Sequence, residues 1–134
     1  MAVGLATALA TTQAMRHTEG KRLQELQQLF FKLVAEQLPT AQINGSRKLR
    51  IPNNVHLTLA GQDNERLLIQ LDEAGVLAAA GSACSASDEE PSHVLRAIGL
   101  SDAEAQASLR FTMGRHTDEA AIQRTVELLQ QFSS

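Results

Sequence analysis

The first third of the chain carries apolar residues at the spacing of a helix. They recur every three or four positions, at Leu23, Leu26, Phe30 and Leu33. This spacing places them on one face of an amphipathic helix. Because proline is absent from residues 3–38, we predict one long helix over that range, with a bend near Gly20. Pro39 ends the predicted helix.

The middle of the chain changes to the two-residue alternation of a strand. Residues 55–59 read Val-His-Leu-Thr-Leu, a pattern that predicts a strand with one face buried. Residues 44–46, Asn-Gly-Ser, predict a turn. Three further short strands are predicted, at 41–44, at the apolar run 76–80 and at 108–112.

Caps and stop signals predict further helices around 67–71, between 91 and 99, from 101 and from 117. Gly75 stops the first of them, and Pro91 and Gly99 bound the second. Ser101 and Glu104 have the spacing of a capping box. Together the elements predict an α+β fold, in which helices pack against a small mixed sheet and the first helix is long. We expect residues 1–134 to form a single domain.

Charge and composition exclude several classes of partner. The formal net charge is −3, Tyr and Trp are absent, and the basic residues are scattered apart from a short cluster at 47–50. This composition disfavours nucleic acids as partners, because phosphate binding needs a concentrated basic face and single strands need aromatic platforms. The sequence has no apolar run long enough for a bilayer and no close histidine or cysteine pair for a metal. One cysteine fits a reducing compartment, so we expect a cytoplasmic protein.

The only cysteine, Cys84, lies in the small-residue run 81–87, which the acids of 88–90 follow. Such a loop gives the sulfur little cover, which suits a nucleophile that moves to its reaction partner. A single thiol names no partner, so an incidental surface cysteine remains an alternative at this point. The neighbouring acids oppose ionisation of the thiol, and its activation must come from outside this segment.

Two motifs carry a resemblance to a known family. Residues 81–100 begin Gly-Ser-Ala-Cys-Ser-Ala-Ser, and residues 108–115 read Ser-Leu-Arg-Phe-Thr-Met-Gly-Arg. They resemble the C-terminal domain of the cysteine desulfurases of the NifS/IscS kind, which are pyridoxal-phosphate enzymes of the class V aminotransferase group. Residues 51–59 are similar to the family's Pro-Asn strand, and residues 3–9 to the start of its interdomain helix. The resemblance therefore implies the small domain of a fold-type I transferase.

The resemblance also implies roles for individual residues. Cys84 attacks the substrate sulfur, holds it as a persulfide and leaves alanine to be released. Arg110 holds the substrate carboxylate, which a planar guanidinium matches with two parallel hydrogen bonds; without the family, it reads as an exposed arginine on an edge strand. Asn53 lines the same cleft, although an asparagine after proline is commonly a turn residue.

The implied partners are L-cysteine as substrate, a sulfur acceptor or scaffold protein for iron–sulfur cluster or other sulfur-cofactor assembly, and a second copy of the full-length enzyme in a homodimer. Pyridoxal phosphate is the implied cofactor of that full-length enzyme. The family's imine-forming lysine lies in its large domain, and none of the lysines here, Lys21, Lys32 and Lys48, lies in a matching motif. We therefore expect the cofactor-binding domain to be absent from this chain, and the chain alone to bind no cofactor and to be inactive.

Two positions depart from the family pattern. His56 and His116 stand where asparagine and phenylalanine are expected, which affects the details of the cleft. Three alternatives stay open: a cofactor-free sulfur carrier that uses Cys84, an interaction domain that has lost the chemistry, and a selenocysteine lyase or related aminotransferase.

Overall fold

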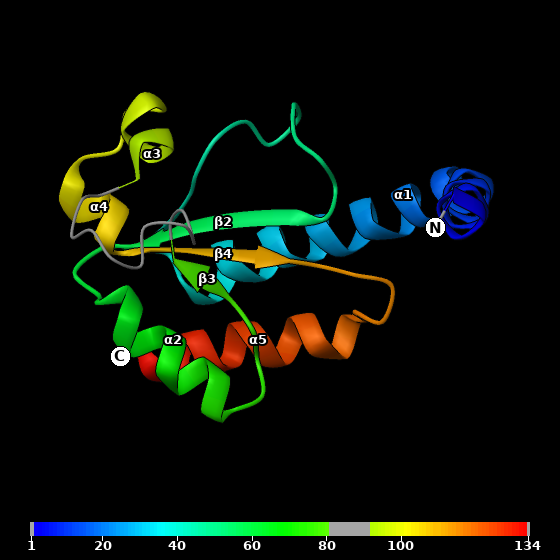
Figure 1. The fold of residues 1–134 in the computed structure, drawn as a ribbon. Helices are drawn as coiled ribbons and strands as arrows, with labels where there is room; N and C mark the ends of the chain where they lie inside the picture. The colour runs from blue at the N-terminus through cyan, green and yellow to red at the C-terminus, as the bar shows by residue number, and fades with distance from the viewer. Residues whose placement is uncertain (1, 81–91, 134) are drawn as a thin grey trace.

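The computed structural model describes residues 2–80 and 92–133, so Cys84 and Pro91 lie outside the described residues. Within these ranges the elements are α1 (Ala2–Gln37), β1 (Ala41–Ile43), β2 (Asn54–Leu59), α2 (Asn64–Glu73), β3 (Ala79–Ala80), α3 (His93–Ala97), α4 (Asp102–Gln106), β4 (Ser108–Thr112) and α5 (Glu119–Phe132). Figure 1 shows α2 and α5 on one side of the strands and α3 on the other. The predicted fold class, a small sheet with helices and a long first helix, is confirmed.

The four described strands form one sheet in the order β1-β2-β4-β3. All three pairings are antiparallel, whereas the prediction specified a mixed sheet. Strand β4 is internal, and its Arg110 lies opposite His56 of β2 and Ala79 of β3. Arg110 is therefore held from both sides and does not lie on an edge strand.

Strand β3 is shorter than the 76–80 segment that the apolar run predicts. Val76 takes part in the hydrogen bonds that close the C-terminal end of α2, because its backbone N–H donates to the carbonyl of Leu71 at 2.8 Å. Gly75 makes this ending possible with a φ of +81°, a backbone conformation that favours glycine. Leu77 is 81% exposed, so the apolar character of this run does not reflect a buried strand.

The predicted stop and cap at the α3–α4 junction are confirmed. Gly99 has a φ of +94°, and the N–H of Leu100 donates back to the carbonyl of Leu95 at 3.1 Å. This is the Schellman ending that a glycine allows. Ser101 and Glu104 form the capping box at the start of α4. Helix α4 ends at Gln106, and β4 begins at Ser108 after a single intervening residue.

One face of the sheet forms the core with α1, α2 and α5. Alternate residues of β2 and β4, among them Leu57 and Leu109, are fully buried on this face. The rings of Phe30 in α1 and Phe111 in β4 lie 5.4 Å apart at an angle of 56°, a tilted arrangement that aromatic pairs favour. Burying each such side chain contributes about 1.5–3 kcal/mol. This face therefore provides most of the packing between the sheet and the helices.

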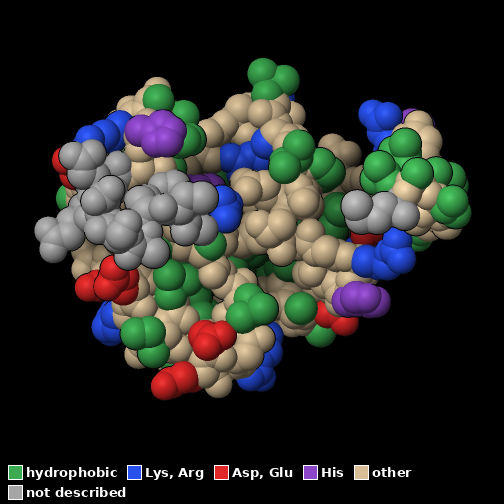
Figure 2. All heavy atoms as spheres, viewed as in Figure 1, with side chains coloured by type: hydrophobic (Ala, Val, Ile, Leu, Met, Phe, Trp, Pro, Cys, Tyr) green, Lys and Arg blue, Asp and Glu red, His purple; other side chains and the backbone are tan. Residues whose placement is uncertain are grey.

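Helix α1 has two halves with different environments. Its second half carries the buried side chains, from Leu23 to Val34, while residues 2–18 are all exposed. In Figure 1 the first turns are seen end-on and the later turns run across the view, so the helix changes direction. Hydrophobic side chains gather on this projecting end in Figure 2, where Val3, Leu5 and Leu9 are 80%, 73% and 67% exposed. Among the described helices, none is long and apolar enough to cross a membrane.

Candidate functional site

The second face of the sheet carries polar side chains. His56 and Thr58 alternate with the core residues of β2, and their register partners in β4 are Arg110 and Ser108. A cavity of about 320 Å³ opens beside His56 and Arg110. It is also lined by apolar side chains of α3 and its C-cap, namely Val94, Leu95 and Ile98. The fold thus places the predicted substrate arginine at a cavity between the sheet and α3.

Arg110 is partly buried, and the described residues provide its guanidinium with no hydrogen bond or ion pair. A second arginine, Arg50, lines the same cavity. Its Nη2 donates to the carbonyl of Asn44 and its Nε to that of Ser46, whereas its buried Nη1 has no acceptor within the described part of the chain. The described lining contains no carboxylate. Two guanidinium groups that have no carboxylate partner in the described ranges favour an anionic ligand, because an unmatched buried donor costs free energy.

Four polar side chains form a continuous hydrogen-bonded row along this face. The Ser108 hydroxyl donates to the carbonyl of Glu104 at 2.6 Å, and the Ser108 and Thr58 hydroxyls lie 2.7 Å apart. Asn44 Nδ2 lies 2.8 Å from Thr58 Oγ1 and 2.8 Å from His56 Nδ1. Asn44, Thr58 and Ser108 are 2%, 3% and 0% exposed. The row therefore anchors the His56 ring to a buried network.

The pKa of His56 is lowered from its ordinary value of 6.5, chiefly because burial disfavours the charged imidazolium. The positive charges of Arg110 and Arg50 lower it further. His56 is therefore neutral at pH 7, with one ring nitrogen protonated and the other free to accept a hydrogen bond.

Asn53 and Cys84 stay predictions. The carbonyl of Asn53 accepts a hydrogen bond from the N–H of Met113 at 2.8 Å, which holds the residue beside the end of β4. Its neighbour Asn54, and not Asn53, is among the described residues that line the cavity. Cys84 lies outside the described residues, so its distance from Arg110 is not defined.

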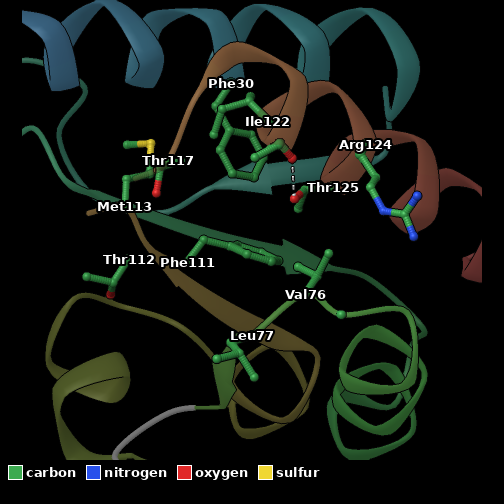
Figure 3. Close-up of a pocket in the computed structure, with 12 residues that line it drawn as sticks. Phe30, Val76, Leu77, Phe111, Thr112, Met113, Thr117, Ile122, Arg124 and Thr125 are labelled. Atoms are coloured by element: carbon green, nitrogen blue, oxygen red, sulfur yellow. Dashed lines mark hydrogen bonds between the residues drawn. The ribbon is translucent and has the colours of Figure 1, made fainter. Parts of the chain in front are cut away.

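A second cavity, of about 330 Å³, lies on the helix-covered face. Figure 3 shows Ile122 and Thr125 of α5 on one side of it and Val76 and Leu77 on the other. Two of its polar side chains have partners within the protein: Thr125 donates to the carbonyl of Ala121 at 2.7 Å, and Arg124 to that of Ala74 at 3.1 Å. Neither Arg110 nor Asn53 is among the described residues that line it. The described residues also contain no cluster of His, Asp or Glu that could hold a metal ion.

Comparison with known proteins decides the family. A family model described as Aminotransferase class-V matches residues 1–125. The chain belongs to the class-V aminotransferase family. Relatives named Cysteine desulfurase IscS include one from Dictyoglomus turgidum, 36% identical over 130 residues, and one from Pseudomonas putida, 38% identical over 120 residues. These matches cover 97% and 90% of the chain but 33% and 29% of the relatives, so the chain spans about a third of the length of the curated relatives it matches.

Solved structures show the same fold for this class-V aminotransferase chain. A structure titled NIFS-LIKE PROTEIN aligns over 96% of the chain and 32% of its own length, with a TM-score of 0.80 and 17% identity. A NifS-like protein from Rickettsia africae aligns over 83% of the chain and 28% of its own length, with a TM-score of 0.70 and 22% identity. At these identities the match supports the α+β architecture alone.

The polar face contains residues that the sequence did not assign to the site. In the hydrogen-bonded row, Asn44 belongs to a predicted turn and Thr58 and Ser108 to predicted strands, while Arg50 belongs to the basic cluster at 47–50. The useful signal is the alternation in the two strands. Once β2 and β4 are paired, the polar positions between their core residues fall on one face.

Proposed function

We propose that residues 1–134 form the small, C-terminal domain of a pyridoxal-phosphate-dependent cysteine desulfurase. The observation that carries the proposal is Arg110, whose guanidinium lines a cavity without a partner among the described residues. The L-cysteine carboxylate is the ligand we propose for it, bound through two parallel hydrogen bonds that fix the substrate's orientation. The relatives named cysteine desulfurase support this choice of substrate. Asn53, next to the cavity-lining Asn54, completes the proposed substrate site.

Cys84 is the proposed sulfur acceptor. Its thiolate forms a bond to the sulfur of L-cysteine as the substrate's carbon–sulfur bond breaks, and the substrate carbon takes a proton to give alanine. The persulfide on Cys84 then passes its outer sulfur to the thiol of an acceptor protein that supplies iron–sulfur cluster or other sulfur-cofactor assembly. A serine at this position is too weakly acidic to replace the thiolate.

The residues of this chain do not fit the role of binding pyridoxal phosphate. None of its lysines, Lys21, Lys32 and Lys48, is among the described residues that line the Arg110 cavity, and an imine to the cofactor needs a lysine at the site. We therefore place the cofactor-binding residues in a preceding large domain of the full-length protein. The exposed apolar residues of α1, Val3 and Leu5 among them, support a covering domain of this kind. The full-length protein is proposed to be a cytoplasmic homodimer, and the chain alone to be inactive.

A pulse of L-cysteine given to the full-length, cofactor-loaded protein tests the proposal. Mass spectrometry is expected to find one added sulfur on Cys84, and alanine to be released. Cys84→Ser should abolish both products, while Ser85→Ala, a matched change one residue away, should retain them. If the Cys84→Ser protein releases alanine and delivers sulfur at the normal rate, the proposed role of Cys84 is wrong.

The chain alone provides the complementary test. Mixed with pyridoxal phosphate and passed through a gel-filtration column, it is expected to carry no imine absorbance in the visible and to release no alanine from L-cysteine. A visible band that survives the column, and is lost on changing Lys21, Lys32 or Lys48 to arginine, would show that this chain holds the cofactor itself.

A further inference from the structure

The hydrogen-bonded row on the polar face determines which nitrogen of His56 carries its proton. Ser108 has one hydroxyl proton, and it is given to the carbonyl of Glu104. The Ser108 oxygen must therefore accept the hydrogen bond from Thr58, whose single proton is used in turn. Thr58 Oγ1 is then left as an acceptor, and the atom of Asn44 that faces it must be the donating Nδ2.

The same Asn44 nitrogen reaches His56. Because Asn44 Nδ2 can only donate, His56 Nδ1 must accept, and it therefore carries no proton. A neutral imidazole with a free Nδ1 has its proton on Nε2. The described residues provide no hydrogen-bond partner for Nε2. His56 therefore has a fixed donor that lines the cavity and has no acceptor in the part of the chain that the structure describes.

Resting on the function proposed above, we propose that His56 is a positioning residue that donates a second hydrogen bond, from Nε2–H, to the substrate carboxylate held by Arg110. The two residues lie directly opposite each other in neighbouring strands, where Cβ atoms are about 4.5–5.5 Å apart. Both side chains line the same cavity. A carboxylate has enough lone pairs to accept from both groups at once.

The surroundings favour an anion rather than a cation at this place. Among the residues that the structure describes, the charged groups that face His56 are Arg110 from β4 and Arg50 from the segment after β1. Helix α3 and its two caps contribute the apolar Val94, Leu95 and Ile98 and the uncharged Ser92. With the imidazole uncharged, His56 adds a directional donor without a further positive charge. It therefore orients the carboxylate, while Arg110 supplies the charge.

The first test uses this chain and sodium propionate, a simple carboxylate, so it does not depend on desulfurase activity. Two-bond proton–nitrogen spectra should show His56 protonated on Nε2 and free on Nδ1. Propionate should shift the Nε2 signal saturably, and His56→Leu should weaken propionate binding about tenfold or more, as expected for loss of a hydrogen bond to a charged group. His56→Gln, which retains a donor, should weaken it less, and His17→Gln on the exposed part of α1 should have no effect.

Three outcomes would overturn the proposal: a proton on Nδ1, a chain that does not bind propionate, or unchanged propionate binding in a folded His56→Leu chain. A second test uses the full-length enzyme. His56→Leu should raise KM for L-cysteine about tenfold or more with little change in kcat, and His56→Gln should partly restore it. If activity depends on Arg110 but KM is unchanged in His56→Leu, the role of His56 is wrong and the proposed function stands. If the full-length protein lacks desulfurase activity, the proposed function fails, and the propionate results still decide whether His56 binds a carboxylate.

Discussion

The two faces of the sheet are built by the same two strands and differ in how completely their groups are paired. On the helix-covered face, Leu109 and Phe111 are buried among apolar side chains of α1, α2 and α5. On the other face, Ser108 is paired within the hydrogen-bonded row, whereas Arg110 has no partner among the described residues. A structural face satisfies its groups internally, and a binding face leaves charged groups for a ligand. The comparison predicts that changes on the first face affect stability and changes at Arg110 affect function.

The largest effect on stability should come from the helix-covered face. Phe30→Ala removes a ring that is 1% exposed and packs against Phe111, and we expect a loss of about 3–5 kcal/mol in the free energy of unfolding. Urea denaturation of the chain measures this loss. Ile69→Ala, at a position that is 62% exposed, is the matched control and should change stability by about 0.5 kcal/mol or less. Equal effects of the two changes would contradict the core we describe.

A smaller loss should follow from breaking the hydrogen-bonded row. Ser108→Ala leaves the buried Thr58 hydroxyl without its acceptor and removes the donor to the Glu104 carbonyl. The expected cost is about 1–3 kcal/mol in the free energy of unfolding. Thr7→Ala removes a hydroxyl that donates to the Val3 carbonyl on an exposed part of α1, so denaturation should show little change. If Ser108→Ala is as mild as Thr7→Ala, the row does not stabilise the fold.

The row should also control the titration of His56. Asn44→Asp replaces the amide that donates to His56 Nδ1 with a carboxylate. A nearby negative charge stabilises the imidazolium, so the pKa of His56 should rise from its lowered value. Proton NMR of the histidine ring across a pH series measures this. A pKa that falls, or does not move, would mean that Asn44 does not face the ring in solution.

The smallest effect concerns the pH dependence of stability. The pKa of His56 is lower in the folded chain than its ordinary value of 6.5, so the unfolded chain binds a proton first as the pH falls. Stability contributed by neutral His56 is therefore fully present above about pH 6.5 and is lost as the pH falls below it towards the folded-state pKa. His56→Gln should flatten this part of the stability profile. An unchanged profile in His56→Gln would contradict the burial of the ring.

Elements whose signals lie within a few residues were predictable from sequence. The capping box at Ser101, the glycine stops at Gly75 and Gly99 and the strand 108–112 are all confirmed, because caps, left-handed glycines and alternation act locally. The strand predicted at 76–80 is longer than the observed β3, Ala79–Ala80. An apolar run does not reveal whether another element covers it, and Leu77 of this run is exposed.

The site depends on pairings that no local pattern contains. The motif around Arg110 could be recognised, but its neighbour His56 lies 54 positions earlier in the chain and meets it only through the β2–β4 register. The role of Asn44 requires the complete path of protons from Ser108 to the imidazole. His56 is a departure from the family pattern in the sequence, and its partners in the structure give this departure a chemical consequence.

Arg110→Lys in the full-length enzyme tests the central claim most directly, because lysine retains the charge and loses the two-pronged geometry. We expect kcat/KM for L-cysteine to fall about tenfold to a hundredfold, which corresponds to about 1.5–3 kcal/mol, while stability changes by about 0.5 kcal/mol or less. Arg16→Lys on the exposed part of α1 is the control and should leave both quantities unchanged. If kcat/KM is the same in the Arg110→Lys and Arg16→Lys enzymes, Arg110 does not bind the substrate carboxylate, and the assignment of the polar face as the substrate site is wrong.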